Sequence, residues 1–160
     1  MRRSFVLGAL GLIAMAGVAV GCSDSKTAST TTAGGGDVTV PSGAEGTPVA
    51  VVAADTSATT QTLTADPISV AAGQVTFTFQ NTGTKQHEMI ILKTDDAIDA
   101  LVVGADDKVS EAASVGEISE TDAGKTVTKT FPLAAGKYIL VCNIAKHYAQ
   151  GMRVAFTVTG

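Results

Sequence analysis

Short runs of β-branched and aromatic residues follow one another from Pro48 to the end of the chain. Turn signals such as Asp-Pro, Ala-Ala-Gly and Asn-Thr-Gly separate these runs. In the run 75–80 apolar and polar residues alternate, so we expect Val75, Phe77 and Phe79 to face a core. The expected strands are 49–53, 61–64, 68–71, 75–80, 87–92, 125–131, 136–142 and 153–159. Short strands at this spacing predict an all-β sandwich of about seven to eight strands.

Residues 94–124 interrupt the strand pattern. Apolar spacing over 95–103 is compatible with a short helix, and the stretch from Asp95 to Asp122 holds nine carboxylates against the single Lys108. One interpretation is a solvated insertion, short and helical or irregular. The other is a docking surface for a basic partner, because a field of one sign speeds encounter.

The first 22 residues are typical of an export signal. Met1-Arg2-Arg3 is followed by an apolar run over 5–20 that is short for a membrane span, and then by Gly21-Cys22. The ending Ala-Val-Gly-Cys resembles a bacterial lipobox, so we expect residues 1–21 to be a lipoprotein signal peptide and Cys22 to carry the lipid. The alternative is ordinary secretion with an unmodified Cys22.

Residues 22–47 are mostly Ser, Thr and Gly, which predicts a flexible tether because such a composition buries little apolar surface. A lipid on Cys22 would anchor the protein to the outer face of the cytoplasmic membrane, with one domain, residues 48–160, on the periplasmic side. Without Arg2 and Arg3 the chain keeps nine basic against fifteen acidic residues, a net charge of −6. Nucleic acid is therefore not expected as a partner.

Residues 142–152 concentrate side chains that bind soft metal ions. They include Cys142, His147 and Met152, and the only other histidine in the chain is His87, which is predicted to open a strand. Two imidazoles, one thiolate and a weak axial thioether form the ligand set of a blue-copper site. The four residues together predict a site for one copper ion, whereas Met89, two residues after His87, is predicted to pack in the core.

Both segments resemble the cupredoxins, the type 1 copper proteins, over roughly residues 48–160. The spacing Cys-x4-His-x4-Met, with His-Tyr-x-x-Gly-Met inside it, is most similar to the rusticyanin and sulfocyanin branch. The resemblance implies a Greek-key sandwich, one type 1 copper and electron transfer. The chain departs from the family at two places: Glu88 stands where an Asn often braces the two ligand loops, and Ala145-Lys146 replaces a frequent Pro-Gly.

Three functions compete for this set of residues. The first is a membrane-tethered carrier of single electrons, not an enzyme, whose redox protein partners dock through the acidic insertion or through an apolar patch of Ala145, Tyr148 and Ala149 near His147. The second is a copper carrier or scavenger that delivers copper to another exported protein. The third, an enzyme with Cys142 as nucleophile, is the weakest because no third residue orients the pair that Cys142 would form with His147. A loop held between two strands, with His87 starting another strand across the sandwich, favours the electron carrier.

Overall fold

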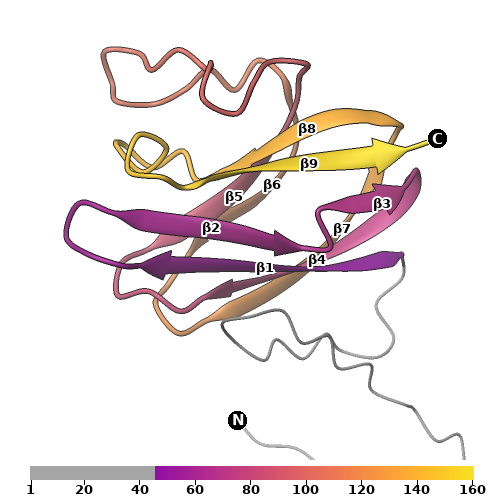
Figure 1. Cartoon of the computed structure of the whole chain (residues 1–160). Helices are drawn as coiled ribbons and strands as arrows, with labels where there is room; N and C mark the ends of the chain where they lie inside the picture. Colours follow the sequence, from indigo (N-terminus) through magenta and orange to yellow (C-terminus); the bar gives the residue numbers. More distant parts are fainter. Residues whose placement is uncertain (1–45) are drawn as a thin grey trace, which may run out of the picture.

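The computed structural model describes residues 46–160, which form two sheets packed face to face (Figure 1). The strand order is β2-β1-β4-β7 in the first sheet and β3-β9-β8-β5-β6 in the second. The strands are β1 (Thr47–Asp55), β2 (Gln61–Asp66), β3 (Ser69–Ala71), β4 (Gly73–Asn81), β5 (His87–Lys93), β6 (Ser114–Thr121), β7 (Thr126–Leu133), β8 (Gly136–Val141) and β9 (Arg153–Thr159). The predicted all-β sandwich is confirmed. Within 46–160 no helix is long and apolar enough to cross a membrane.

The core between the sheets follows the alternation in the sequence. Val75, Phe77 and Phe79 of β4 are fully buried, as predicted. The ring of Phe77 contacts Phe131 on the same sheet and Phe156 on the opposite one, with centroids 6.2 and 5.5 Å apart. Aromatic pairs at this distance contribute beyond their buried area, so Phe77 joins the two layers.

The insertion is shorter than predicted, because its C-terminal part forms β6, a strand that the sequence did not predict. β6 lies at the edge of the second sheet and pairs antiparallel with β5. Only Ile118 and Thr121 of β6 are buried, so the strand carries almost none of the apolar alternation that reveals the others. Of the two forms expected for the insertion, helical or irregular, the structure shows the irregular one: residues 94–113 contain only turns, bends and an isolated bridge between Val103 and Val109.

The insertion packs on the outer face of the second sheet (Figure 1). Its buried Val109 and its partly buried Ile98 and Leu101 pack on a second hydrophobic cluster. The remaining members of that cluster are Ile90, Leu92, Ile139, Val141 and Tyr148. β5 and β8 are therefore covered on both faces, and a purely solvated insertion is the wrong description, although its carboxylates are exposed.

The end of the second sheet brings the predicted ligand segments together. β5 and β8 are neighbours in this sheet, with Ile90 opposite Val141, so the expectation that His87 lies across the sandwich from the loop is wrong. At the start of β8, the end far from Cys142, the sequence Gly136-Lys137-Tyr138 predicts a tyrosine corner, and the Tyr138 hydroxyl donates to the carbonyl of Ala134 at 2.6 Å. This bond fixes the connection that leads into β8.

The predictions for the N-terminus concern residues outside the described part of the chain. They are the signal peptide 1–21, the lipidation of Cys22 and all but the last two residues of the tether 22–47. Thr47, predicted to end the tether, is instead the first residue of β1.

Candidate metal centre

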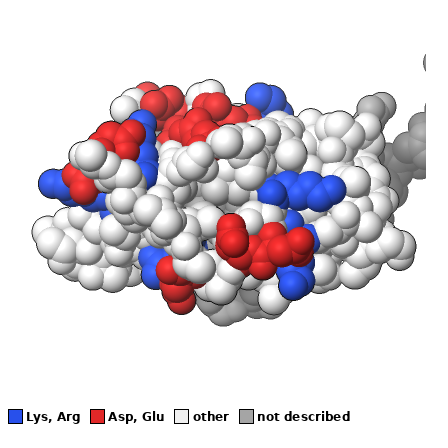
Figure 2. All heavy atoms as spheres, turned by 90° about the horizontal axis from the view of Figure 1, so that it is seen from above, with Lys and Arg blue, Asp and Glu red and all other residues white. Residues whose placement is uncertain are grey.

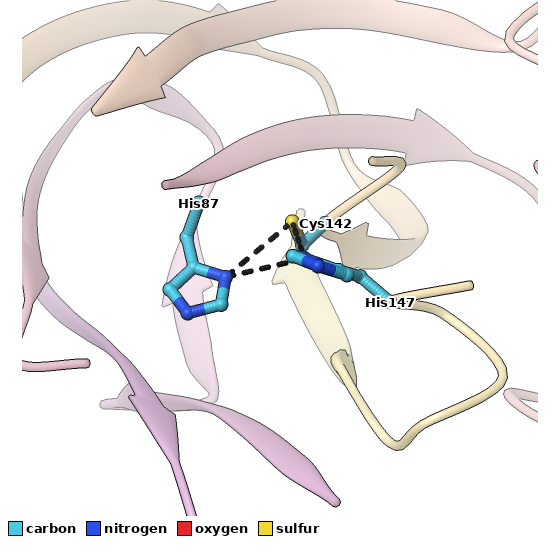
Figure 3. Close-up of side chains that lie close together, drawn as sticks. All are labelled: His87, Cys142 and His147. Carbon is cyan, nitrogen blue, oxygen red and sulfur yellow. Dashed lines mark hydrogen bonds between the residues drawn. The ribbon is translucent and has the colours of Figure 1, made fainter. Parts of the chain in front are cut away.

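Three predicted ligands converge at one end of the second sheet. His87 opens β5, Cys142 directly follows β8, and His147 lies in the loop that leads to β9. One donor atom from each lies within 4.8 Å of the others, and Figure 3 shows the two rings and the thiol turned toward one another. His87 and Cys142 are fully buried, and His147 is 7% exposed. The arrangement is therefore built inside the protein and not on its surface.

The distances between these donors fit one metal ion. Cys142 Sγ lies 3.3 Å from His147 Nδ1 and 4.0 Å from His87 Nδ1, and the two Nδ1 atoms are 3.3 Å apart. Nitrogen and sulfur donors about 2.0–2.3 Å from a common centre, as for zinc, would lie roughly 3.5–3.8 Å from one another in a trigonal plane. Two imidazoles and a thiol at this separation are a donor set for copper.

Burial keeps the metal-free donors uncharged. It raises the pKa of the Cys142 thiol to about 11 and, together with the neighbouring His87, lowers the pKa of His147 to about 4. Burial also lowers the pKa of His87. At neutral pH the site therefore holds a thiol and two neutral imidazoles, and a metal ion that binds the thiolate would release the thiol proton.

Met152 lies where the loop returns to the sheet. Its side chain is fully buried, its N–H donates to the carbonyl of His147 at 3.0 Å, and its own carbonyl accepts the N–H of Cys142 at 3.1 Å. The preceding Gly151 has a φ of 116°, and a Cβ there would lie 2.6 Å from the carbonyl oxygen of Gln61. Only glycine therefore allows the loop to pass β2 and bring Met152 beside Cys142.

Glu88 links the two ligand segments despite replacing the asparagine that is frequent in the family. Its N–H donates to Cys142 Sγ at 3.4 Å, and its carboxyl group accepts the N–H of Asn143 at 3.1 Å. Burial and the nearby Glu120 raise the pKa of this carboxyl group to about 7. The departure in sequence thus preserves the brace and adds an ionisable group beside the site.

Asn143 has no role that the sequence alone predicts, yet it ties the loop to the insertion. Its Oδ1 accepts the N–H of Val109 at 2.8 Å, and its Nδ2 donates to the carbonyl of Val109 at 3.0 Å and to Glu111 Oε1 at 2.7 Å. Nearby, the N–H of Lys146 donates to the carbonyl of Asp107 at 2.9 Å. Such bonds between distant segments leave no periodic signal in a sequence.

The surface around His147 differs from the predicted apolar patch. Ala145 and Ala149 are exposed, but Tyr148 is buried. The Tyr148 hydroxyl donates to the carbonyl of Ile98 at 2.7 Å, and Arg153 lies over its ring at 4.9 Å. The insertion therefore covers Tyr148, and only the two alanines remain available for an exposed patch.

The face that carries the insertion has mixed charge. Figure 2 shows groups of acidic side chains with basic side chains between them. One of the acids, Asp99, forms an ion pair with Arg153, whose Nη2 lies 2.6 Å from Asp99 Oδ1. The acids between Asp95 and Asp122 therefore do not form an uninterrupted acidic surface.

Comparisons with known proteins agree with this fold. The model of the sulfocyanin (SoxE) domain family matches residues 46–160. No curated protein matches the chain significantly. Among solved structures, reduced rusticyanin is 25% identical, with a TM-score of 0.53 over 72% of this chain and 82% of its own. Reduced auracyanin from Roseiflexus castenholzii is 22% identical, with a TM-score of 0.52 over 72% of this chain and 100% of its own. Rusticyanin from Thiobacillus ferrooxidans is 23% identical, with a TM-score of 0.51 over 72% of this chain and 79% of its own.

Proposed function

Because the chain belongs to the sulfocyanin family of cupredoxins, we propose that it carries single electrons between exported redox proteins. It is a cupredoxin-like blue copper protein with one type 1 copper ion as cofactor, and cupredoxins are generally electron carriers and not enzymes. Copper supplies, when bound, a one-electron change between Cu(I) and Cu(II). The observation that carries the proposal is the buried convergence of His87, Cys142 and His147 within 4.8 Å.

Cys142, His87 and His147 would hold the copper ion, and Met152 would be a fourth, weaker ligand. Copper(II) added to the purified domain should give an intense blue or green colour, because the thiolate transfers charge to the metal. Cys142→Ser should fold and stay colourless, and a wild-type visible spectrum in this variant would contradict the ligand assignment. Met152→Leu should keep copper and raise its reduction potential, since axial bonds in such sites are long and weak.

A copper carrier is the second candidate, and the burial of the site argues against it. A protein that hands over its metal usually does so from an exposed or mobile site. Here His87 lies on a strand, and the loop 142–152 is bonded to the insertion at Asn143 and Lys146. Fast electron exchange with a small redox reagent is expected in stopped-flow, together with slow copper loss to a chelator. Slow electron exchange with copper loss within seconds would establish the carrier instead.

The docking site for a redox partner is proposed at the exposed Ala145 and Ala149 beside His147. Of the three donor residues, His147 alone has measurable exposure, at 7%. Acidic side chains of the insertion would attract a cationic partner from a distance, which predicts a faster reaction at low salt. If the rate of this reaction did not depend on salt, the acidic side chains of the insertion would not attract the partner.

The proposed location is the outer face of the cytoplasmic membrane, through a lipid on Cys22 after removal of residues 1–21. This part of the proposal is supported by the sequence alone. A palmitate analogue should label the wild type and not Cys22→Ala, which should be released in soluble form. Label retained in the variant would rule out lipidation at Cys22.

A further inference from the structure

One carboxylate outside the predicted ligand set faces the copper site. Asp55 ends β1 in the first sheet, and its Oδ1 lies 3.2 Å from Nε2 of His87, the ring nitrogen that points away from Cys142. Both atoms are buried, and neither has a hydrogen-bond partner elsewhere in the described part of the chain. The two atoms do not meet the geometry of a hydrogen bond, yet buried polar atoms need a partner, and 3.2 Å is close enough for a small shift to form one.

The other carboxylate oxygen of Asp55 is firmly held. Its Oδ2 accepts the N–H groups of Thr84 at 2.6 Å and Lys85 at 3.1 Å, and the hydroxyl of Thr84 at 3.1 Å. Three donors on one oxygen favour the carboxylate form of Asp55 and fix that oxygen to the loop. The other oxygen is directed at His87.

The backbone leaves room for this contact. A Cβ on Gly83 would lie 2.6 Å from Asp55 Oδ2 and 3.0 Å from His87 Nε2. Any side chain at position 83 would therefore crowd both the carboxylate and the imidazole. The glycine, the two N–H donors and the end of β1 together form a cradle around the pair.

We propose that Asp55 is a positioning residue of the metal centre, whose carboxylate holds the proton of His87 on Nε2 and keeps Nδ1 unprotonated toward Cys142 and His147. A neutral imidazole carries one proton, and the group bonded to one nitrogen decides which nitrogen carries it. Carboxylates play this part behind metal-bound histidines in other sites. The inference rests on the proposed function for its benefit to copper, but the position of the proton is a property of the metal-free protein.

The test compares the wild type with Asp55→Asn and with Asp95→Asn, an exposed carboxylate of the insertion that serves as a charge-matched control. In Asp55→Asn, the oxygen of the introduced amide can replace Oδ2 as acceptor for Thr84 and Lys85. The NH2 group of that amide then faces Nε2 of His87 and favours a proton on Nδ1. Nitrogen-15 NMR of histidine-labelled, metal-free protein reports the protonated ring nitrogen, and competition with a chelator reports copper(II) affinity.

In the wild type and in Asp95→Asn, His87 should be protonated on Nε2. In Asp55→Asn the proton should shift toward Nδ1, and copper(II) affinity should fall about 10- to 100-fold, the usual effect of removing such a partner. A wild-type proton on Nδ1 would overturn the proposal, even if the variant failed to fold. So would an Asp55→Asn variant with unchanged ring protonation and affinity. Failure of the wild type to bind copper would instead contradict the proposed function and leave the ring result standing.

Discussion

Two buried asparagines hold the two ligand-bearing segments, but they fasten them to different parts of the molecule. Asn81 ends β4 in the first sheet, and its Nδ2 donates to the carbonyls of Lys85 and Thr121, both at 2.8 Å. Its Oδ1 accepts the N–H of Gly83 at 2.9 Å. Asn143, beside Cys142, makes its side-chain bonds to the irregular insertion. The first segment is thus tied to the two sheets and the second to a long connection.

This difference predicts unequal stability on the two sides of the metal centre. Regular strands with a packed core open with a free energy near that of global unfolding, whereas irregular surface segments open more easily. His87 lies on the first kind of structure and His147 on the second. The copper loop therefore depends on the insertion for its order, which gives the insertion a structural role besides any part in docking.

Replacing either asparagine is expected to have the largest effect on stability. Asn81→Ala and Asn143→Ala each remove three hydrogen bonds and leave buried backbone groups unpaired. Each should lower the free energy of unfolding of the metal-free protein by about 3 kcal/mol, measured in urea. Amide exchange should accelerate at Val109 and Lys146 in Asn143→Ala, and around Lys85 and His87 in Asn81→Ala.

A third variant serves as a control for the two asparagine variants. Thr128→Ala removes a hydroxyl that shares one long contact with Thr78, at 3.3 Å, on the first sheet and should change stability by much less. If both asparagine variants accelerated exchange at the same amides, the two sides would form one cooperative unit. The predicted difference in stability between the sheet side and the insertion side of the site would then be wrong.

The sequence predicts the parts of this protein that are periodic. Val75, Phe77 and Phe79 indicate the inner face of a strand, because side chains alternate between the two faces every two residues. The four residues His87, Cys142, His147 and Met152 indicate a metal site, because their side chains bind the same class of ion. Such signals are local and need no knowledge of the fold.

What the sequence leaves out depends on contacts between distant segments. The sequence does not predict β6, because this strand is formed by pairing with β5 and has little apolar alternation of its own. Asp55 and Asn143 act on backbone or side-chain atoms about 30 residues away, and Asp and Asn occur in most loops. Tyr148 is predicted at the surface because nothing in the sequence shows that the insertion covers it.

Glu88 offers a smaller test, because it bonds to Cys142 and Asn143 from the His87 side. Its pKa of about 7 in the folded protein exceeds the ordinary value of 4.5. The folded state therefore binds more protons between pH 4.5 and 7, and the contribution of Glu88 to stability falls as the pH rises through this range. Glu88→Gln has no ionisable group at this position, so it removes this decrease in stability with rising pH. The stability of the variant relative to wild type should rise by about 2 kcal/mol from pH 4.5 to 7 in the metal-free protein.

Urea denaturation of both proteins at several pH values measures this difference. His147, whose pKa is lowered to about 4, destabilises the fold as the pH falls, but it does so in both proteins and cancels. A difference that stayed constant with pH would show that Glu88 is ionised at neutral pH in the folded protein. The link between the two segments would then include a buried charge.

The smallest effect concerns backbone strain, which lies on the insertion side of the site. Among the residues that the structure describes, Asp107 and Lys146 are the non-glycine residues with positive φ, at 61° and 75°, and the N–H of Lys146 donates to the carbonyl of Asp107. For a residue other than glycine this conformation costs about 1–2 kcal/mol, and glycine adopts it at little of that cost. Lys146→Gly should therefore stabilise the metal-free protein by about 1 kcal/mol after the greater flexibility of glycine in the unfolded chain is allowed for. Lys146→Ala, which removes the same exposed side chain but keeps the strain, is the matched control and should not gain stability. Equal stability of the two variants in urea would mean that the loop relaxes without cost, and that the insertion holds the copper loop in a conformation that it already prefers.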